Sequence, residues 1–220
     1  MAIKPDTVEA VAAVVAAALR PGVDADWSVR AGGLEWSVDR TIAHMTGAPG
    51  KYALYLSGRS PRYVAVRVWP VEDATRQERL EAIEGCAAAL AGVAAAAPED
   101  AFGFHVSGMR NAQQFLAMAC RELLVHAYDV TCGLGLSYDP PEELCQLVVR
   151  HCYPEQHEQR PVWPFLVWLS GRGHPAATGW GQPPAGGAVM FGDKLASRAE
   201  IPLEFDRDPA GQWRAIRWAT

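Results

Sequence analysis

The stretch that decides the fold is residues 107–135, which reads SGMRNAQQFLAMACRELLVHAYDVTCGLG. Apolar side chains recur along it at the helical period, as Phe115, Met118 and Val130 do. Such a stripe is typical of a helix that turns one face to a core. The pattern predicts a long helix over about residues 109–132, and the two glycines that follow it are typical of a helix end.

One pair of ionisable residues interrupts the apolar face of this helix. Glu122 and His126 are four residues apart, so their side chains lie on one face with Cβ atoms roughly 5–6 Å apart. Ionisable groups on an inward face are costly unless they are paired or bind a metal. The residues alone leave two interpretations open, a hydrogen-bonded pair or two ligands of one metal ion. Asp129 follows on the same side, either as an acceptor for the imidazole or as a solvated carboxylate.

The rest of the chain predicts a mainly α protein. Further helices are expected over residues 7–19, 37–56, 139–152 and 161–170, and one that begins at Asp73 or Thr75 and ends near Pro98. Ser37 and Asp139 are expected as N-caps, and residues 57–71 as a loop or extended crossover. Gly47-Ala-Pro-Gly50 should kink or break the second of them.

The C-terminal residues change character. Ile201, Leu203 and Phe205 alternate with polar residues, residues 208–211 read as a turn, and residues 213–218 can return as a strand. This pattern predicts a small β-hairpin. A lone hairpin is only marginally stable in water, so we expect it to pack on the helices.

Composition excludes several classes of function. The 220 residues carry a net charge of −5 without a basic run, which argues against nucleic-acid binding. No apolar run approaches the roughly 18 residues of a membrane span, and Asp6 and Glu9 stand where a signal peptide would be basic. Five cysteines without a Cys-x-x-Cys motif argue against a disulfide framework and for a reducing cytoplasm. A monomer and a homodimer both remain open.

A catalytic metal site needs a third protein ligand, and two histidines with one glutamate are a known zinc set. The candidates are His44, His105, His151, His157 and His174. Periodicity alone does not place His44 on an inward face, because Val38, Ile42 and Met45 lie across the helix from it.

Several short motifs occur in a distinctive order. Trp36-Ser37-Val38 and Ile42-Ala43-His44-Met45 precede the Arg-Glu-Leu-Leu-Val-His-Ala-Tyr-Asp-Val run of residues 121–130, and Trp168-Leu-Ser-Gly-Arg172 follows. This series resembles the DinB-like superfamily, and most of all its mycothiol-dependent maleylpyruvate isomerase branch. The resemblance implies a four-helix bundle and a metal held by His44, Glu122 and His126. We expect this bundle over residues 1–158 and a small C-terminal segment over residues 159–220, which is short for the family's usual second domain.

The resemblance also implies a chemistry. A divalent metal, with zinc as the first choice, would activate mycothiol or a similar small thiol for attack on a small electrophilic substrate, in S-transfer or cis-trans isomerisation. No residue of the chain has to act as the nucleophile. Arg110 and Gln114 could hold a substrate carboxylate or polar groups of the thiol, or could form a solvated first turn, and Arg62 and Arg67 are equally ambiguous. Two alternatives stay open: a thiol-independent role in small-molecule metabolism, and a binding protein whose metal is structural or absent.

Overall fold

The computed structural model describes residues 2–64, 66–156, 160–172 and 202–218. Its helices are α1 (Pro5–Leu19), a short 3₁₀ helix η1 (Arg20–Gly22), α2 (Val38–Gly58), α3 (Arg76–Ala96), α4 (Ala112–Leu134), α5 (Glu142–Cys152) and α6 (Val162–Leu169). Its strands form two antiparallel pairs, β1 (Phe102–Gly103) with β2 (Arg110–Asn111), and β3 (Pro202–Arg207) with β4 (Trp213–Trp218). The mainly α fold with a small β segment is therefore as the sequence predicts.

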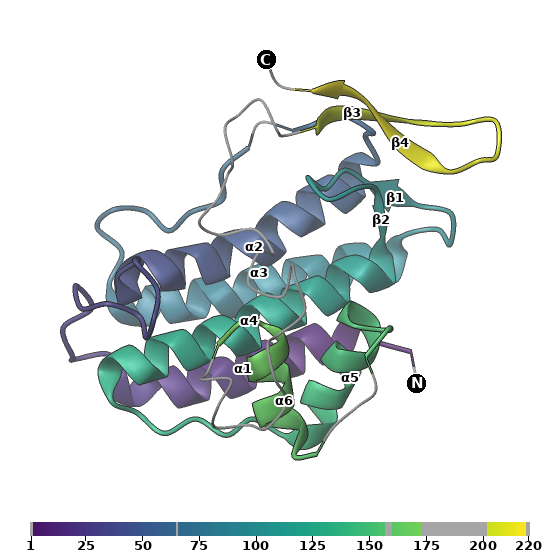
Figure 1. Cartoon of the computed structure of the whole chain (residues 1–220). Coiled ribbons are helices and arrows are strands. Elements are labelled where there is room, and N and C mark those ends of the chain that lie inside the picture. Colours follow the sequence, from purple (N-terminus) through teal and green to yellow (C-terminus); the bar gives the residue numbers. More distant parts are fainter. Residues whose placement is uncertain (1, 65, 157–159, 173–201, 219–220) are drawn as a thin grey trace.

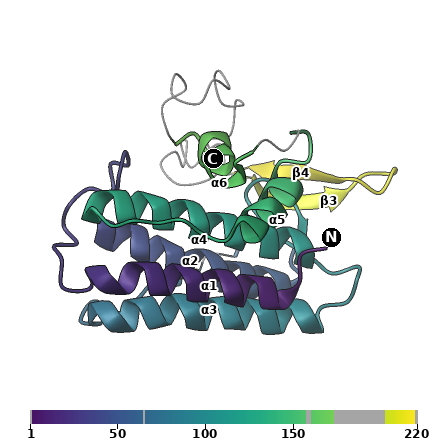
Figure 2. The same cartoon turned by 90° about the horizontal axis from the view of Figure 1, so that it is seen from below.

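Four helices form the body of the molecule. Helix α2 packs against α3 and α4, and α1 packs against the same two helices from the other side (Figures 1 and 2). Residues 59–64 and 66–75 return along the length of the bundle, so α2 and α3 run in the same direction and α1 and α4 run opposite to them. A long crossover of this kind is one of the two common ways to connect a four-helix bundle.

Local sequence signals fix where the bundle helices begin and end. The Ser37 hydroxyl accepts a hydrogen bond from the backbone N–H of Arg40, so Ser37 is the N-cap of α2, as predicted. Thr75 and Glu78 form a reciprocal capping box at the start of α3. Gly135 ends α4 with a φ of 67°, a left-handed conformation that glycine adopts without strain.

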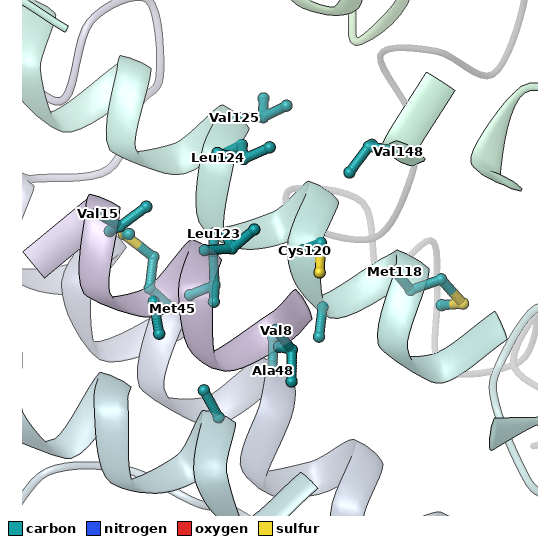
Figure 3. Close-up of a cluster of buried hydrophobic side chains, with 14 of the residues drawn as sticks. Val8, Val15, Met45, Ala48, Met118, Cys120, Leu123, Leu124, Val125 and Val148 are labelled. Carbon is teal, nitrogen blue, oxygen red and sulfur yellow. The ribbon is translucent and has the colours of Figure 1, made fainter. Parts of the chain in front are cut away.

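Helix α4 is the central helix of the core. Most of its residues are buried, because α1, α2, α3 and α5 all contact it. Leu123 on α4 lies with Met45 of α2 and Val15 of α1 in one buried cluster (Figure 3). Apolar packing on several sides also buries the charged and imidazole side chains in the middle of α4, so their polar partners decide what these side chains can do.

Helix α2 is continuous, so the break expected at Gly47-Ala-Pro-Gly50 is wrong. The two glycines instead make room for the crossover. A Cβ atom on Gly47 would lie 2.7 Å from the backbone oxygen of Val68, and one on Gly50 would lie 2.7 Å from the Val68 side chain. The sequence signal was real, but it marks a close approach between two segments and not a helix end.

Helices α5 and α6 cover one side of α4. Trp163 of α6 stacks edge-on against Tyr128 of α4 and against Tyr138, with ring centroids 5.9 and 5.4 Å apart. The expectation that Asp139 is the N-cap of α5 is wrong, since the helix begins at Glu142 after Pro141. The division of the chain at residue 158 stays a prediction.

The C-terminal hairpin forms as expected, and it contacts strand β1 and the crossover. Trp213 of β4 packs on Phe102 of β1, with ring centroids 6.1 Å apart. Arg62 of the crossover forms an ion pair with Glu204 of β3 at 2.9 Å and an isolated backbone bridge with the same residue. None of the described helices has the length and apolar character needed to cross a membrane.

Candidate metal centre

Helices α2 and α4 bring three side chains together: His44, Glu122 and His126, called the candidate cluster below. One ligand atom from each lies within 4.8 Å of the other two. The Oε2 atom of Glu122 is 3.0 Å from Nε2 of His44 and 3.3 Å from Nε2 of His126. His44 therefore faces inward, which periodicity could not establish, because its helix is covered on more than one side.

The two oxygens of the Glu122 carboxylate have different partners. Oε2 faces the two imidazoles, whereas Oε1 accepts a hydrogen bond from Nη1 of Arg121 at 3.0 Å. Burial alone would raise the pKa of Glu122, but the hydrogen bonds of His126 and His44 and the charge of Arg121 outweigh it and hold this pKa well below its usual range. Glu122 is thus an anionic carboxylate with one oxygen turned toward the histidines.

Arg121 belongs to a buried polar network that reaches the outer helices. Its Nε donates to the Tyr153 hydroxyl at 2.7 Å, and that hydroxyl lies 3.2 Å from the hydroxyl of Ser170. The Arg121 side chain is only 3% exposed. Residues from the end of α5 and the end of α6 therefore help to fix the orientation of the Glu122 carboxylate.

His126 is held from behind by a second carboxylate. Oδ2 of Asp129 lies 3.0 Å from Nδ1 of His126, and Arg172 donates from Nε and Nη2 to the two oxygens of Asp129 at 3.2 and 3.0 Å. Asp129 is buried, so the alternative of a solvent-facing carboxylate is wrong. Burial works against a charged imidazole, yet the hydrogen bonds to Asp129 and Glu122 raise the pKa of His126.

His44 has a looser environment. Its Nδ1 atom has no hydrogen-bond partner among the described residues, while Trp36 lies beside its ring with centroids 5.2 Å apart. The Trp36 indole also stacks on the His126 ring, with ring centroids 6.4 Å apart. The guanidinium carbon of Arg40 lies 4.6 Å from the centroid of the Trp36 ring. Burial lowers the pKa of His44, and the hydrogen bond to Glu122 opposes this effect without cancelling it.

The donor set fits a divalent metal. Ligand atoms of a tetrahedral zinc site with bonds of about 2.0–2.2 Å are themselves roughly 3.3–3.6 Å apart. Oε2 lies 3.0 and 3.3 Å from the two Nε2 atoms, and all three ligand atoms lie within 4.8 Å of one another. The Asp129 carboxylate favours a proton on Nδ1 of His126, which leaves the Nε2 lone pair directed into the candidate cluster. Two imidazoles and a carboxylate suit zinc, and are also compatible with nickel, iron and manganese.

Arg110 and Gln114 lie away from the candidate cluster. Gln114 is two turns before Glu122 on α4, about 12 Å along the helix axis, and its side-chain oxygen caps the backbone N–H of Asn111. Arg110 donates to the backbone and hydroxyl oxygens of Ser107. Their proposed role in binding a cofactor stays a prediction, and the structure gives each of them a local structural partner.

The two other histidines that the structure describes, His105 and His151, do not belong to the candidate cluster. His105 is buried, accepts a hydrogen bond from the backbone N–H of Ser107 at Nδ1, and has its pKa lowered by burial to about 3. His151 pairs with the backbone oxygen of Leu147 at the end of α5. The two remaining candidates, His157 and His174, lie outside the described residues.

The five cysteines all lie among the described residues and are free thiols. Cys120 and Cys145 are buried and Cys132 is exposed. Burial raises the pKa values of Cys145 and Cys152 to about 12, which makes neither of them a ready nucleophile at neutral pH.

Sequence reasoning missed three charged residues around the candidate cluster, Arg121, Arg172 and Lys51. Arg121 and Arg172 stood inside quoted motifs, but nothing in a linear pattern says which carboxylate an arginine will meet. Lys51 follows His44 by seven residues. That spacing, two helical turns on one face, is a signal that could have been used.

The comparisons with known proteins add no assignment: no family model matches the chain, and neither the curated proteins nor the solved structures contain a significant match. The resemblance to the DinB-like superfamily therefore rests on the short motifs alone.

Proposed function

We propose that this protein is an enzyme that uses the candidate cluster to hold a divalent metal, and that it catalyses transfer or isomerisation reactions of a small electrophile with a low-molecular-weight thiol of the mycothiol type. The proposal of a bound metal rests on one observation, the convergence of one carboxylate oxygen and two imidazole nitrogens from α2 and α4. The proposal of a small thiol as cosubstrate rests on the resemblance of the motifs to the mycothiol-dependent branch of the DinB-like superfamily.

The described residues supply three ligands, and a catalytic metal with three protein ligands keeps a coordination position for a small molecule. When bound, a divalent ion would act as a Lewis acid that lowers the pKa of a thiol, so that thiolate is available near neutral pH. The side chain of His44 is 14% exposed, against 4% for Glu122 and 8% for His126. Access to the candidate cluster is therefore from the His44 side.

The remaining residues of the centre have supporting roles. Arg121 fixes one of the oxygens of Glu122, and Asp129 fixes the tautomer and ring orientation of His126. Trp36 covers both imidazoles and keeps part of the bulk solvent away from them. A dry and preorganised environment strengthens electrostatic interactions with a reacting group.

A direct assay tests this proposal. Protein loaded with zinc is mixed with a generic electrophile and either mycothiol or another small thiol, and the loss of free thiol is followed. We expect consumption that depends on metal and disappears in His44→Ala and His126→Ala, while Cys132→Ser, which removes an exposed thiol, keeps it. A protein that binds zinc but consumes no thiol with any electrophile tried would overturn the thiol chemistry and favour a thiol-independent role.

A further inference from the structure

One hydrogen-bonded path connects the end of α6 to Glu122. The Ser170 hydroxyl lies 3.2 Å from the Tyr153 hydroxyl. Tyr153 accepts a hydrogen bond at 2.7 Å from Nε of Arg121, whose Nη1 donates to Oε1 of Glu122 at 3.0 Å. Ser170, Arg121 and Glu122 are all buried, so the loss of one partner would leave a costly unsatisfied polar group. The path therefore holds the end of α6 and the Glu122 carboxylate in one arrangement.

A second path connects the same turn to His126. Helix α6 ends in a Schellman motif, in which the backbone N–H groups of Gly171 and Arg172 return to carbonyl oxygens of the helix at 2.9 and 3.0 Å. Gly171 has a φ of 72°, a left-handed conformation that reverses the chain. Arg172 then donates to both oxygens of Asp129, the partner of His126, and to the backbone oxygen of Ser170 at 2.8 Å. Both α4 ligands are thus connected to one turn, residues 170–172.

The body of α6 is apolar. Residues Val162–Leu169 include no charged side chain, and all of them except Pro164 are buried. Apolar burial is non-directional, so it holds α6 against its neighbours without fixing the exact position of its last turn. The directional contacts of Ser170 and Arg172 are what place that turn relative to the ligands.

We propose that residues 170–172 form a positioning element for the candidate cluster, and that metal binding and docking of this turn on α4 strengthen each other. This inference rests on the metal of the proposed function and adds a form of regulation, because a change that displaces the end of α6 would release the metal. The physical reason is reciprocal linkage. If the docked turn raises the affinity for metal by some factor, bound metal must stabilise the docked turn by the same factor.

Hydrogen exchange of the full chain, followed by mass spectrometry, tests this coupling. We expect zinc to slow exchange of the backbone amides of residues 165–172 by about tenfold relative to the metal-free protein, within the usual range of coupling between sites. Tyr153→Phe cuts the first path, and Tyr153→Phe combined with Arg172→Gln cuts both. At zinc concentrations that saturate each variant, the effect on α6 should shrink in the first variant and disappear in the second.

Zinc affinity in the same variants, measured by competition with a chelator, gives a second readout. The factor by which Tyr153→Phe weakens zinc binding should match the factor of zinc-dependent protection that this variant loses. A merely structural role for Tyr153 would loosen α6 equally with and without zinc and leave the affinity unchanged. That result would overturn the inference.

Tyr138→Phe is the matched control. The Tyr138 hydroxyl is buried without a hydrogen-bond partner among the described residues, and its ring lies edge-on against Trp163 of α6, with centroids 5.4 Å apart. This variant loses the same atom as Tyr153→Phe from a tyrosine that contacts the same helix. It should keep the zinc affinity and the full zinc effect on α6.

The metal content of each sample separates the two ways in which the account could fail. A parent that binds zinc without slower exchange at the end of α6 would overturn the inference and leave the proposed metal centre intact. A zinc effect that survives in the double variant would do the same. A parent that takes up no zinc would overturn both the inference and the proposed function.

Discussion

Helices α4 and α2 contribute to the same cluster but hold their side chains differently. On α4, each ligand has a partner behind it, Arg121 for Glu122 and Asp129 for His126. On α2, the outer nitrogen of His44 has no hydrogen-bond partner among the described residues. The α4 half is therefore preorganised by buried ionic networks, whereas the α2 half depends on packing. Removing a residue should cost both fold stability and metal affinity in the first half, and mainly metal affinity in the second.

The largest expected effect contrasts Glu122→Ala with His44→Ala. Loss of Glu122 leaves Arg121 as a buried cation without its carboxylate, which typically costs about 3–5 kcal/mol of unfolding free energy. Loss of His44 removes a metal ligand but leaves no buried charge unpaired, so we expect a cost of about 1 kcal/mol or less in the metal-free protein. Urea unfolding of both variants without metal measures the difference, and equal costs would contradict the comparison.

The next effect concerns the support behind His126. Asp129→Asn and Arg172→Ala leave all three ligands in place, yet should weaken metal binding by about 10- to 100-fold, the usual effect of losing a hydrogen-bonded carboxylate behind a ligand histidine. Competition with a chelator measures the affinity. Arg172→Lys keeps the charge and should recover part of it. Unchanged affinity in Asp129→Asn would show that the network serves only the fold.

A smaller effect tests the packing on which the α2 half depends. Gly47→Ala places a methyl group against the backbone oxygen of Val68, and the crossover must move to accommodate it. We expect a loss of about 1–2 kcal/mol of unfolding free energy, within the range for overpacked sites. Gly92→Ala is the control, because a Cβ atom there meets nothing within 4 Å and the change should be neutral or stabilising. Equal stability of the two variants would argue against close packing of the crossover.

The smallest expected effect is the pH dependence of the metal-free protein. The raised pKa of His126 means that its contribution to stability is complete below pH 6.5 and is lost as the pH rises through the folded-state pKa of this imidazole. The lowered pKa of Glu122 means that its contribution to stability is complete above pH 4.5 and is lost as the pH falls through the folded-state pKa. The lowered pKa of His44 acts in the opposite sense to that of His126, so stability falls below pH 6.5 on its account.

Chemical unfolding across this pH range separates the two imidazoles. His126→Gln should remove the loss of stability above pH 6.5, and His44→Gln should leave that loss in place. The reverse pattern would mean that the roles of the two imidazoles are exchanged. Calorimetry in buffers of different ionisation enthalpy should also show that metal binding releases protons below the raised pKa of His126.

The sequence predicted the elements better than their partners. Helix periodicity and caps such as Ser37 are local signals, so they placed the bundle helices and the hairpin. The helix break predicted at Gly47 and Gly50 was wrong because these glycines allow the close approach of Val68, which is distant in sequence. The Glu122–His126 pair was visible from its spacing. The inward direction of His44 and the arginines behind the ligands depend on tertiary packing, which no linear pattern contains.

The central claim is that the candidate cluster holds one metal ion. The most direct test is elemental analysis of protein purified without an affinity tag, for the parent and for His44→Ala, Glu122→Gln and His126→Ala, before and after incubation with zinc and removal of the excess. The account predicts close to one metal ion per chain in the parent and almost none in the three variants. A folded parent that stays free of metal after incubation with zinc, or variants that keep it, would contradict the claim.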